Sequence, residues 1–190
     1  MLQLELDFST EKINENFSNY SAFHHRSVYI KDIVNEEEFE SILEGEFSII
    51  ESAVYTDPYD QSAWWYMQFL LVWASSIMKK VEVASSIIWF YDLLCRQQVL
   101  LQTLLEVEKN SKWTMNALIL LVDVFLLDDC FFFRKLKTLS KQESLDPNEP
   151  SIENIKLKWK TEKRSLLEQL VELDSLHVSR YKYLMAKLDD

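Results

Sequence analysis

The chain has 190 residues, of which 48% are hydrophobic and 13% aromatic, so it is long and apolar enough to bury a core. It contains one glycine, Gly45, and three prolines, which is too few for the turns of an all-β or doubly wound α/β domain and for any glycine-rich phosphate-binding loop. The net charge of −11 disfavours nucleic acid as a partner. The composition therefore predicts an all-α protein.

The apolar periodicity predicts nine helices with short polar corners between them. In chain order these helices are expected at 2–16, 20–33, 37–56, 61–75, 85–108, 112–128, 130–142, 150–173 and 176–188. Asn19, Asp60 and Asn110 precede helix starts, where their side-chain oxygens can accept from free backbone N–H groups. The polar, proline-containing segment 142–150 is expected to break the chain most clearly.

Several features indicate a cytoplasmic protein without a membrane span. No segment reaches the roughly 20 uncharged residues that a bilayer-spanning helix requires. The first residues show no secretory signal pattern. Cys95 and Cys130 fit no paired motif and are expected to be buried thiols in a reducing compartment.

The predicted helices repeat along the chain. The segment NFSNYSAFHHR at 16–26 matches DPYDQSAWWYM at 57–67 at an offset of 41, and a weaker third copy at an offset of 49 places Trp113 on Trp64. Helix pairs of this kind cannot bury their apolar faces alone, so they stack on their neighbours. We expect a single domain over 1–190, an α/α superhelix (solenoid) of stacked helix hairpins. Its repeats are expected at about 1–35, 36–80 and 85–130, with a degenerate closing unit at 146–190.

The motifs NYSAFHHR, DQSAWWYMQFLL and NSKW resemble the repeats of protein prenyltransferase α-subunits, most closely those of the Rab geranylgeranyltransferase branch. The resemblance covers roughly residues 1–135. It implies an α-subunit that wraps around a zinc-bearing β-subunit. In such a heterodimer, geranylgeranyl passes from its diphosphate to the C-terminal cysteines of Rab proteins, which an escort protein presents.

The resemblance also implies a division of roles between the two subunits. Family α-subunits carry Lys-Asn-Tyr motifs near the diphosphate, and this sequence contains none, so it resembles the C-terminal repeats. Zinc and the lipid are expected in the β-subunit. The chain alone is expected to be inactive, with no catalytic residue, metal or cofactor of its own.

Seven residues are candidates for contact with the β-subunit: Asn19, Tyr20, His24, His25, Arg26, Trp65 and Tyr66. The adjacent histidines point about 100° apart on a helix and are not expected to share a metal ion. Arg26 either pairs with an acid of another repeat or reaches the rim of the partner. Most tryptophans are expected in the core, while Trp65 or Tyr66 faces outward to anchor a partner.

Two other functions remain open from the sequence. The chain could be a truncated, non-catalytic helical-repeat scaffold that binds neither a β-subunit nor an escort protein. It could also be a peptide-binding scaffold of the tetratricopeptide kind, although the period of about 34 residues typical of that class is absent.

Overall fold

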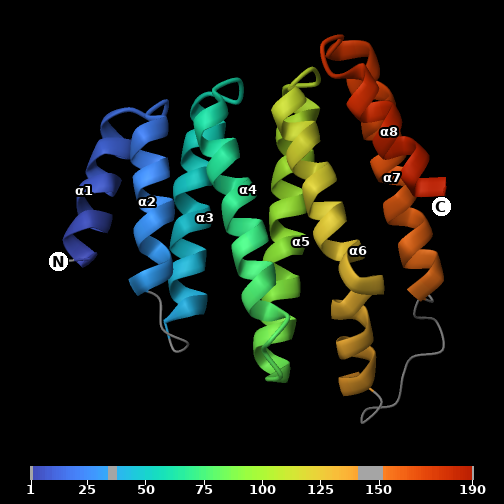
Figure 1. Ribbon diagram of the computed structural model, residues 1–190, viewed down its shortest axis with the longest axis horizontal. Coiled ribbons are helices and arrows are strands. Elements are labelled where there is room, and N and C mark those ends of the chain that lie inside the picture. Colours follow the sequence, from blue (N-terminus) through green and yellow to red (C-terminus); the bar gives the residue numbers. More distant parts are fainter. Residues whose placement is uncertain (1, 34–37, 141–151, 190) are drawn as a thin grey trace. The chain divides into compact units, whose positions relative to one another are not determined.

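The computed structural model describes residues 2–33, 38–140 and 152–189. In these ranges it contains eight helices and no strand, which confirms the prediction of an all-α protein (Figure 1). The helices are α1 (Leu2–Glu15), α2 (Tyr20–Ile33), α3 (Phe39–Thr56), α4 (Gln61–Met78), α5 (Ala84–Val107), α6 (Lys112–Ser140), α7 (Ile152–Leu173) and α8 (Val178–Asp189).

The prediction of two helices between residues 112 and 142 is wrong. Helix α6 runs without interruption from Lys112 to Ser140. It contains no glycine or proline, and aspartates such as Asp128 and Asp129 lower helix propensity by less than about 1 kcal/mol each. The expected break at 142–150 lies outside the described residues, and so does the side chain of Cys130.

The chain divides into two compact units, residues 1–74 and 75–190, and the division falls within α4. In the first unit α1 packs on α2, and the four helices bury one apolar stripe each. The largest fully buried side chains of this unit are Ile13, Phe23, Ile30, Leu43, Phe47, Ile50, Met67, Leu70 and Leu71. In α3 and α4 these side chains recur every three or four residues, and in α2 they are seven residues apart, as in amphipathic helices. The expectation of one superhelical domain stays a prediction.

The two corners of the first unit are built alike, as the repeat predicts. Asn16 Oδ1 accepts from the N–H of Ser18 (3.0 Å), and Asp57 Oδ1 accepts from the N–H of Tyr59 (3.0 Å). The predicted N-caps follow three residues later. Asn19 Oδ1 accepts from the N–H of Ala22 at 3.1 Å, and Asp60 Oδ1 accepts from the N–H of Ser62 at 2.8 Å. Both cap predictions are confirmed.

The cap predicted at the third corner is wrong by one residue. Helix α6 begins at Lys112, so the capping position is Ser111 and not Asn110. Ser111 Oγ accepts from the N–H of Thr114 at 3.3 Å and lies 2.7 Å from the Thr114 hydroxyl. Ser111 is buried whereas Asn110 is exposed, so the residue that caps α6 lies in the interior of the fold.

The second unit is held by packing of α5 on α6, α6 on α7 and α7 on α8. The ring of Phe125 in α6 stacks on Trp159 of α7 (4.4 Å between centroids) and meets Tyr91 of α5 edge-on. Beside this aromatic layer, the buried ammonium of Lys163 pairs with Asp123.

Asp174 organises the corner between α7 and α8. Its Oδ2 accepts from the hydroxyl of Tyr181 (2.9 Å), lies 2.9 Å from His177 Nδ1 and lies 3.8 Å from Lys112 Nζ. Burial opposes the charged carboxylate, but the hydrogen bonds from Tyr181 and His177 outweigh it and lower the pKa of Asp174 below its usual 3.8. The ionised form of Asp174 therefore stabilises the folded chain.

Replacing the cap of α6 tests the corner. We expect Ser111→Ala to lower the free energy of unfolding by about 1 kcal/mol, because the N–H of Thr114 loses its acceptor. Asn110→Ala is the matched control from the same corner, and we expect a change within about 0.5 kcal/mol. Urea denaturation followed by circular dichroism measures both variants. A larger loss for Asn110→Ala than for Ser111→Ala would contradict the capping assignment.

The Asp174 corner makes a pH prediction. Because the pKa of Asp174 is lower in the folded state, its contribution is complete above the usual value of 3.8 and is lost as the pH falls through the lowered value. Asp174→Asn should therefore be less stable than the parent chain at pH 7, and the difference should shrink below about pH 4. Urea midpoints between pH 7 and the lowest pH at which both chains fold give this difference.

Asp92→Asn is the control, since the Asp92 carboxylate is exposed in its pair with Arg96 and should contribute little at any pH. A stability difference for Asp174→Asn that does not change with pH would show that the charge of Asp174 is unimportant.

Candidate functional site

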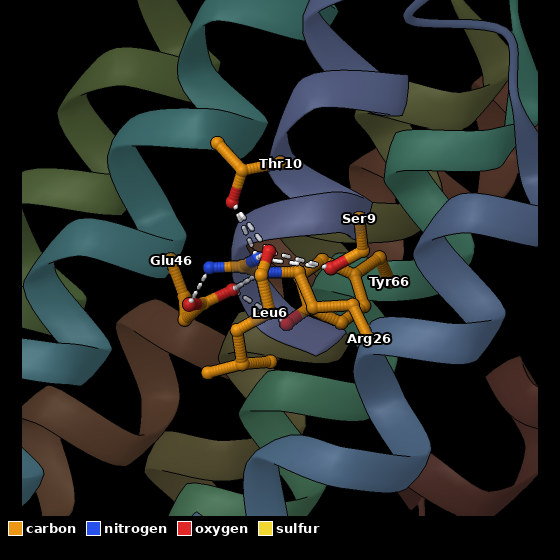
Figure 2. Close-up of polar contacts among 6 residues, drawn as sticks. All are labelled: Leu6, Ser9, Thr10, Arg26, Glu46 and Tyr66. Atoms are coloured by element: carbon orange, nitrogen blue, oxygen red, sulfur yellow. Dashed lines mark hydrogen bonds and ion pairs between the residues drawn. The ribbon is translucent and has the colours of Figure 1, made fainter. Parts of the chain in front are cut away.

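A buried guanidinium joins the four helices of the first unit (Figure 2). Arg26 of α2 binds Glu46 of α3 with two parallel hydrogen bonds, Nε to Oε2 and Nη2 to Oε1, both 2.6 Å long. From α4, the hydroxyl of Tyr66 donates to Glu46 Oε2 at 2.6 Å. The three residues are only 6%, 2% and 2% exposed, respectively. The carboxylate thus receives three hydrogen bonds from two helices.

Helix α1 completes the network from the other side of the guanidinium. Arg26 Nη1 donates to the carbonyl oxygen of Leu6 (2.8 Å), to Thr10 Oγ1 (2.7 Å) and to Ser9 Oγ (3.2 Å). The hydroxyls of Ser9 and Thr10 in turn donate to the Leu6 carbonyl, so their oxygens are left to accept from the arginine. The guanidinium of Arg26 therefore donates hydrogen bonds to acceptors of this chain from Nε, Nη1 and Nη2.

The ion pair changes the protonation equilibria of its members. Burial opposes the charge of Arg26, yet the hydrogen bonds and charge of Glu46 outweigh it and raise the pKa of the guanidinium. Burial, together with the adjacent carboxylate of Glu46, also raises the pKa of Tyr66. The tyrosine therefore stays protonated and serves as a fixed donor. No proton-transfer role follows from this cluster.

A groove between α2 and α4 forms a second feature of this unit. Its volume is about 160 Å³, and eight residues line it: Tyr20, Phe23, His24, Ser27, Ser62, Trp65, Tyr66 and Phe69. Phe23 and Tyr66 are buried beneath it, whereas Tyr20 (54% exposed) and Trp65 (50% exposed) stand open to solvent. Tyr20 stacks on His24 with centroids 6.1 Å apart. We refer to these eight residues as the aromatic groove.

The structure brings four of the seven candidate residues together in the aromatic groove: Tyr20, His24, Trp65 and Tyr66. The sequence allows Arg26 either an ion pair with another repeat or a contact with the partner. The structure confirms the ion pair, which Arg26 forms with Glu46. The sequence predicts that either Trp65 or Tyr66 faces outward, and in the structure Trp65 is the exposed residue. Asn19 caps α2 at the end of the groove.

His25 belongs to a different cluster from His24. Its ring packs on Tyr29 (4.6 Å) and Phe8 (6.3 Å), and its Nε2 lies 3.3 Å from Glu5 Oε2. Within the described parts of the chain, no group of three or more His, Cys, Asp or Glu side chains is arranged to hold a metal ion. Among the same residues, no helix combines the length and apolar character that a bilayer crossing requires.

Two features of this unit are not predicted from the sequence. Glu46 is one, although it lies on the apolar stripe of α3 between Leu43 and Ile50, where a carboxylate requires a buried partner. The other is the remaining half of the groove lining, which consists of Phe23, Ser27, Ser62 and Phe69. Phe69 lies four residues after Trp65 and hence on nearly the same face of α4. Phe69 could therefore have been predicted from its helical spacing relative to the candidate Trp65.

Removing one partner of the buried pair should be costly. We expect Glu46→Gln to lower the free energy of unfolding by about 3–5 kcal/mol, because the guanidinium of Arg26 stays buried without a counter-charge. Arg96→Gln removes an arginine–aspartate pair with a 3.0 Å contact that is largely exposed, and we expect a loss below about 1 kcal/mol. Chemical denaturation compares the two. Equal losses would show that the buried guanidinium of Arg26 does not require the charge of Glu46.

Comparison with known proteins finds a family model that matches the first two repeats. Residues 2–32 and 43–74 match the model of the protein prenyltransferase alpha subunit repeat, and these segments contain the residues that bind Arg26 and Glu46 and those that line the aromatic groove. The chain is 28% identical to "Geranylgeranyl transferase type-2 subunit alpha" of Schizosaccharomyces pombe, over 98% of this chain and 50% of that protein.

Two further relatives agree with this match. The protein of the same name from Saccharomyces cerevisiae is 28% identical over 95% of this chain and 48% of its own length. The human protein of that name is 38% identical over a shorter region, 35% of this chain and 13% of its own length. The chain spans about half the length of the yeast relatives.

The matched segments also contain the sequence repeat and its two similar corners, which are capped by Asn19 and Asp60. Residues 2–32 and 43–74 are therefore similar to the repeats of protein prenyltransferase alpha subunits, and nearly the whole chain is similar to two yeast alpha subunits of type-2 geranylgeranyl transferases.

Proposed function

We propose that this chain acts as an α-subunit, or as part of one, in a heterodimeric geranylgeranyltransferase that modifies Rab proteins. The observation that carries the proposal is the similarity to two yeast type-2 alpha subunits along 98% and 95% of the chain. In this proposal the β-subunit holds the zinc ion and the geranylgeranyl diphosphate. An escort protein presents the Rab substrate, and the complex acts in the cytoplasm.

The contribution of this chain is architectural. Its strongest polar cluster, around Arg26 and Glu46, is closed and internally satisfied, and therefore suits a structural role. The aromatic groove, by contrast, presents side chains to solvent. Aromatic residues combined with few charges are typical of the centre of a protein–protein interface. We therefore assign the contact with the β-subunit to the exposed groove residues Tyr20, His24 and Trp65.

Co-expression with a type-2 β-subunit tests this function. The full 190-residue chain should elute with the β-subunit as a 1:1 complex in size-exclusion chromatography with light scattering. We expect Trp65→Ala to weaken this complex at least about tenfold, because exposed tryptophans often dominate interface energies. Val72→Ala is the matched control, since Val72 is on the same helix, is 57% exposed and does not line the groove.

Separate elution of the two chains would overturn the proposal and favour the alternative of a non-catalytic helical-repeat scaffold. If the complex forms but Trp65→Ala and Val72→Ala behave alike, the subunit role stands and the assignment of the contact to the groove fails.

A further inference from the structure

The first unit is strongly acidic, yet no acidic residue lines the aromatic groove. Residues 1–74 contain fourteen acidic and three basic residues, so this unit accounts for the whole net charge of −11. Helix α4 has no charged residue at all over its 18 positions. None of the eight groove residues is a carboxylate or a permanent cation. The groove is thus an uncharged aromatic surface within a strongly negative unit, whose potential favours a cationic ligand.

The two serine hydroxyls of the groove are placed to accept hydrogen bonds from a ligand. Ser27 Oγ donates to the His24 carbonyl (2.7 Å), and Ser62 Oγ donates to the Ser18 carbonyl (3.2 Å). Their hydrogens are used, so both hydroxyl oxygens can only accept from a ligand. The helix starts nearby are already served by the caps Asn19 and Asp60. These starts therefore leave fewer free donors for an anion.

The rings of the groove can receive a cation on their faces. Lys31 already places its ammonium 5.3 Å from the centroid of Phe69, at one end of the groove. Trp65, the aromatic type that binds cations best, is half exposed and carries no such partner among the described cation–ring contacts. The volume of about 160 Å³ is close to that of an engineered cavity of about 150 Å³ that holds a benzene ring. A planar guanidinium with part of its stem fits such a space.

We propose that the aromatic groove binds an arginine side chain from a basic segment of a partner protein, with the guanidinium against Trp65. The planar guanidinium stacks on aromatic faces and donates to several acceptors at once, here Ser27 and Ser62. An ammonium is a compact and more strongly hydrated charge, so lysine is the weaker occupant. The proposal rests on the proposed function only for the identity of the protein that supplies the arginine.

Titration of the full chain with small probes tests the proposal. The probe is N-acetyl-arginine amide, and the neutral comparison is N-acetyl-citrulline amide, which has nearly the same shape. Nuclear magnetic resonance follows the indole N–H of Trp65, which is identified by its absence from the spectrum of Trp65→Ala. We expect a saturable shift with the arginine probe and an affinity about fivefold higher than that for the citrulline probe.

Variants separate the ring contact from general attraction to a negative protein. Trp65→Tyr should retain most of the binding, followed through the amide of Phe69, whereas Trp65→Leu should lose it although the net charge is unchanged. Val72→Ala should bind like the parent chain. Equal affinity for both probes, tighter binding of N-acetyl-phenylalanine amide, or shifts that persist in Trp65→Leu would each overturn the proposal.

This experiment uses no β-subunit and is therefore independent of the test of the proposed function. A chain that binds the arginine probe but no β-subunit would retain the groove assignment and lose the subunit role. A chain that pairs with a β-subunit but binds the arginine and citrulline probes equally would retain the subunit role and lose the groove assignment.

Discussion

The buried pair of Arg26 and Glu46 is the interaction on which the first unit depends. It is the one place where polar groups of α1, α2, α3 and α4 meet among the described contacts of this unit. Removing two charges from water costs several kcal/mol per ion, and only a nearly complete set of hydrogen bonds offsets this cost. Here the guanidinium has four partners and the carboxylate three donors, so alternative registers of the helices would leave a charge unpaired. The pair thus selects one arrangement more than it adds stability.

At the corners of the first unit, polar side chains stabilise the turns that glycine forms in many helical proteins. The only glycine, Gly45, lies inside α3 and not at a turn. Asn16 and Asp57 instead close the turns through their own side-chain oxygens, and a second polar residue then caps the next helix. Such turns fix the exit of one helix and the start of the next within four residues. This geometry explains how the repeat keeps its spacing with so little glycine.

The sequence predicts the helices, and four residues that line the groove, better than the network that holds the helices together. Periodicity predicts α2 and α4, but it leaves open whether Trp65 or Tyr66 faces outward; the structure exposes Trp65 and buries Tyr66. The partner of Arg26 could not be predicted, because Glu46 is 20 residues away and many acids are equally near in sequence. Asn110 was mistaken for a cap because corner composition does not determine which of two adjacent polar residues takes the capping position. The predicted division into helices at 112–128 and 130–142 is wrong, because neither glycine nor proline interrupts α6.

The first unit separates its charges by helix, and this arrangement has a consequence for recognition. The first helices of its two hairpins, α1 and α3, carry most of the carboxylates, whereas the second helices, α2 and α4, carry Asp32 alone. Long-range attraction to a basic partner then comes from one set of helices, and short-range contact from the other. Attraction of this kind accelerates association and is screened by salt, while the desolvated contact determines how long the complex lasts. An uncharged aromatic groove can therefore discriminate among ligands that the surrounding negative field attracts without distinction.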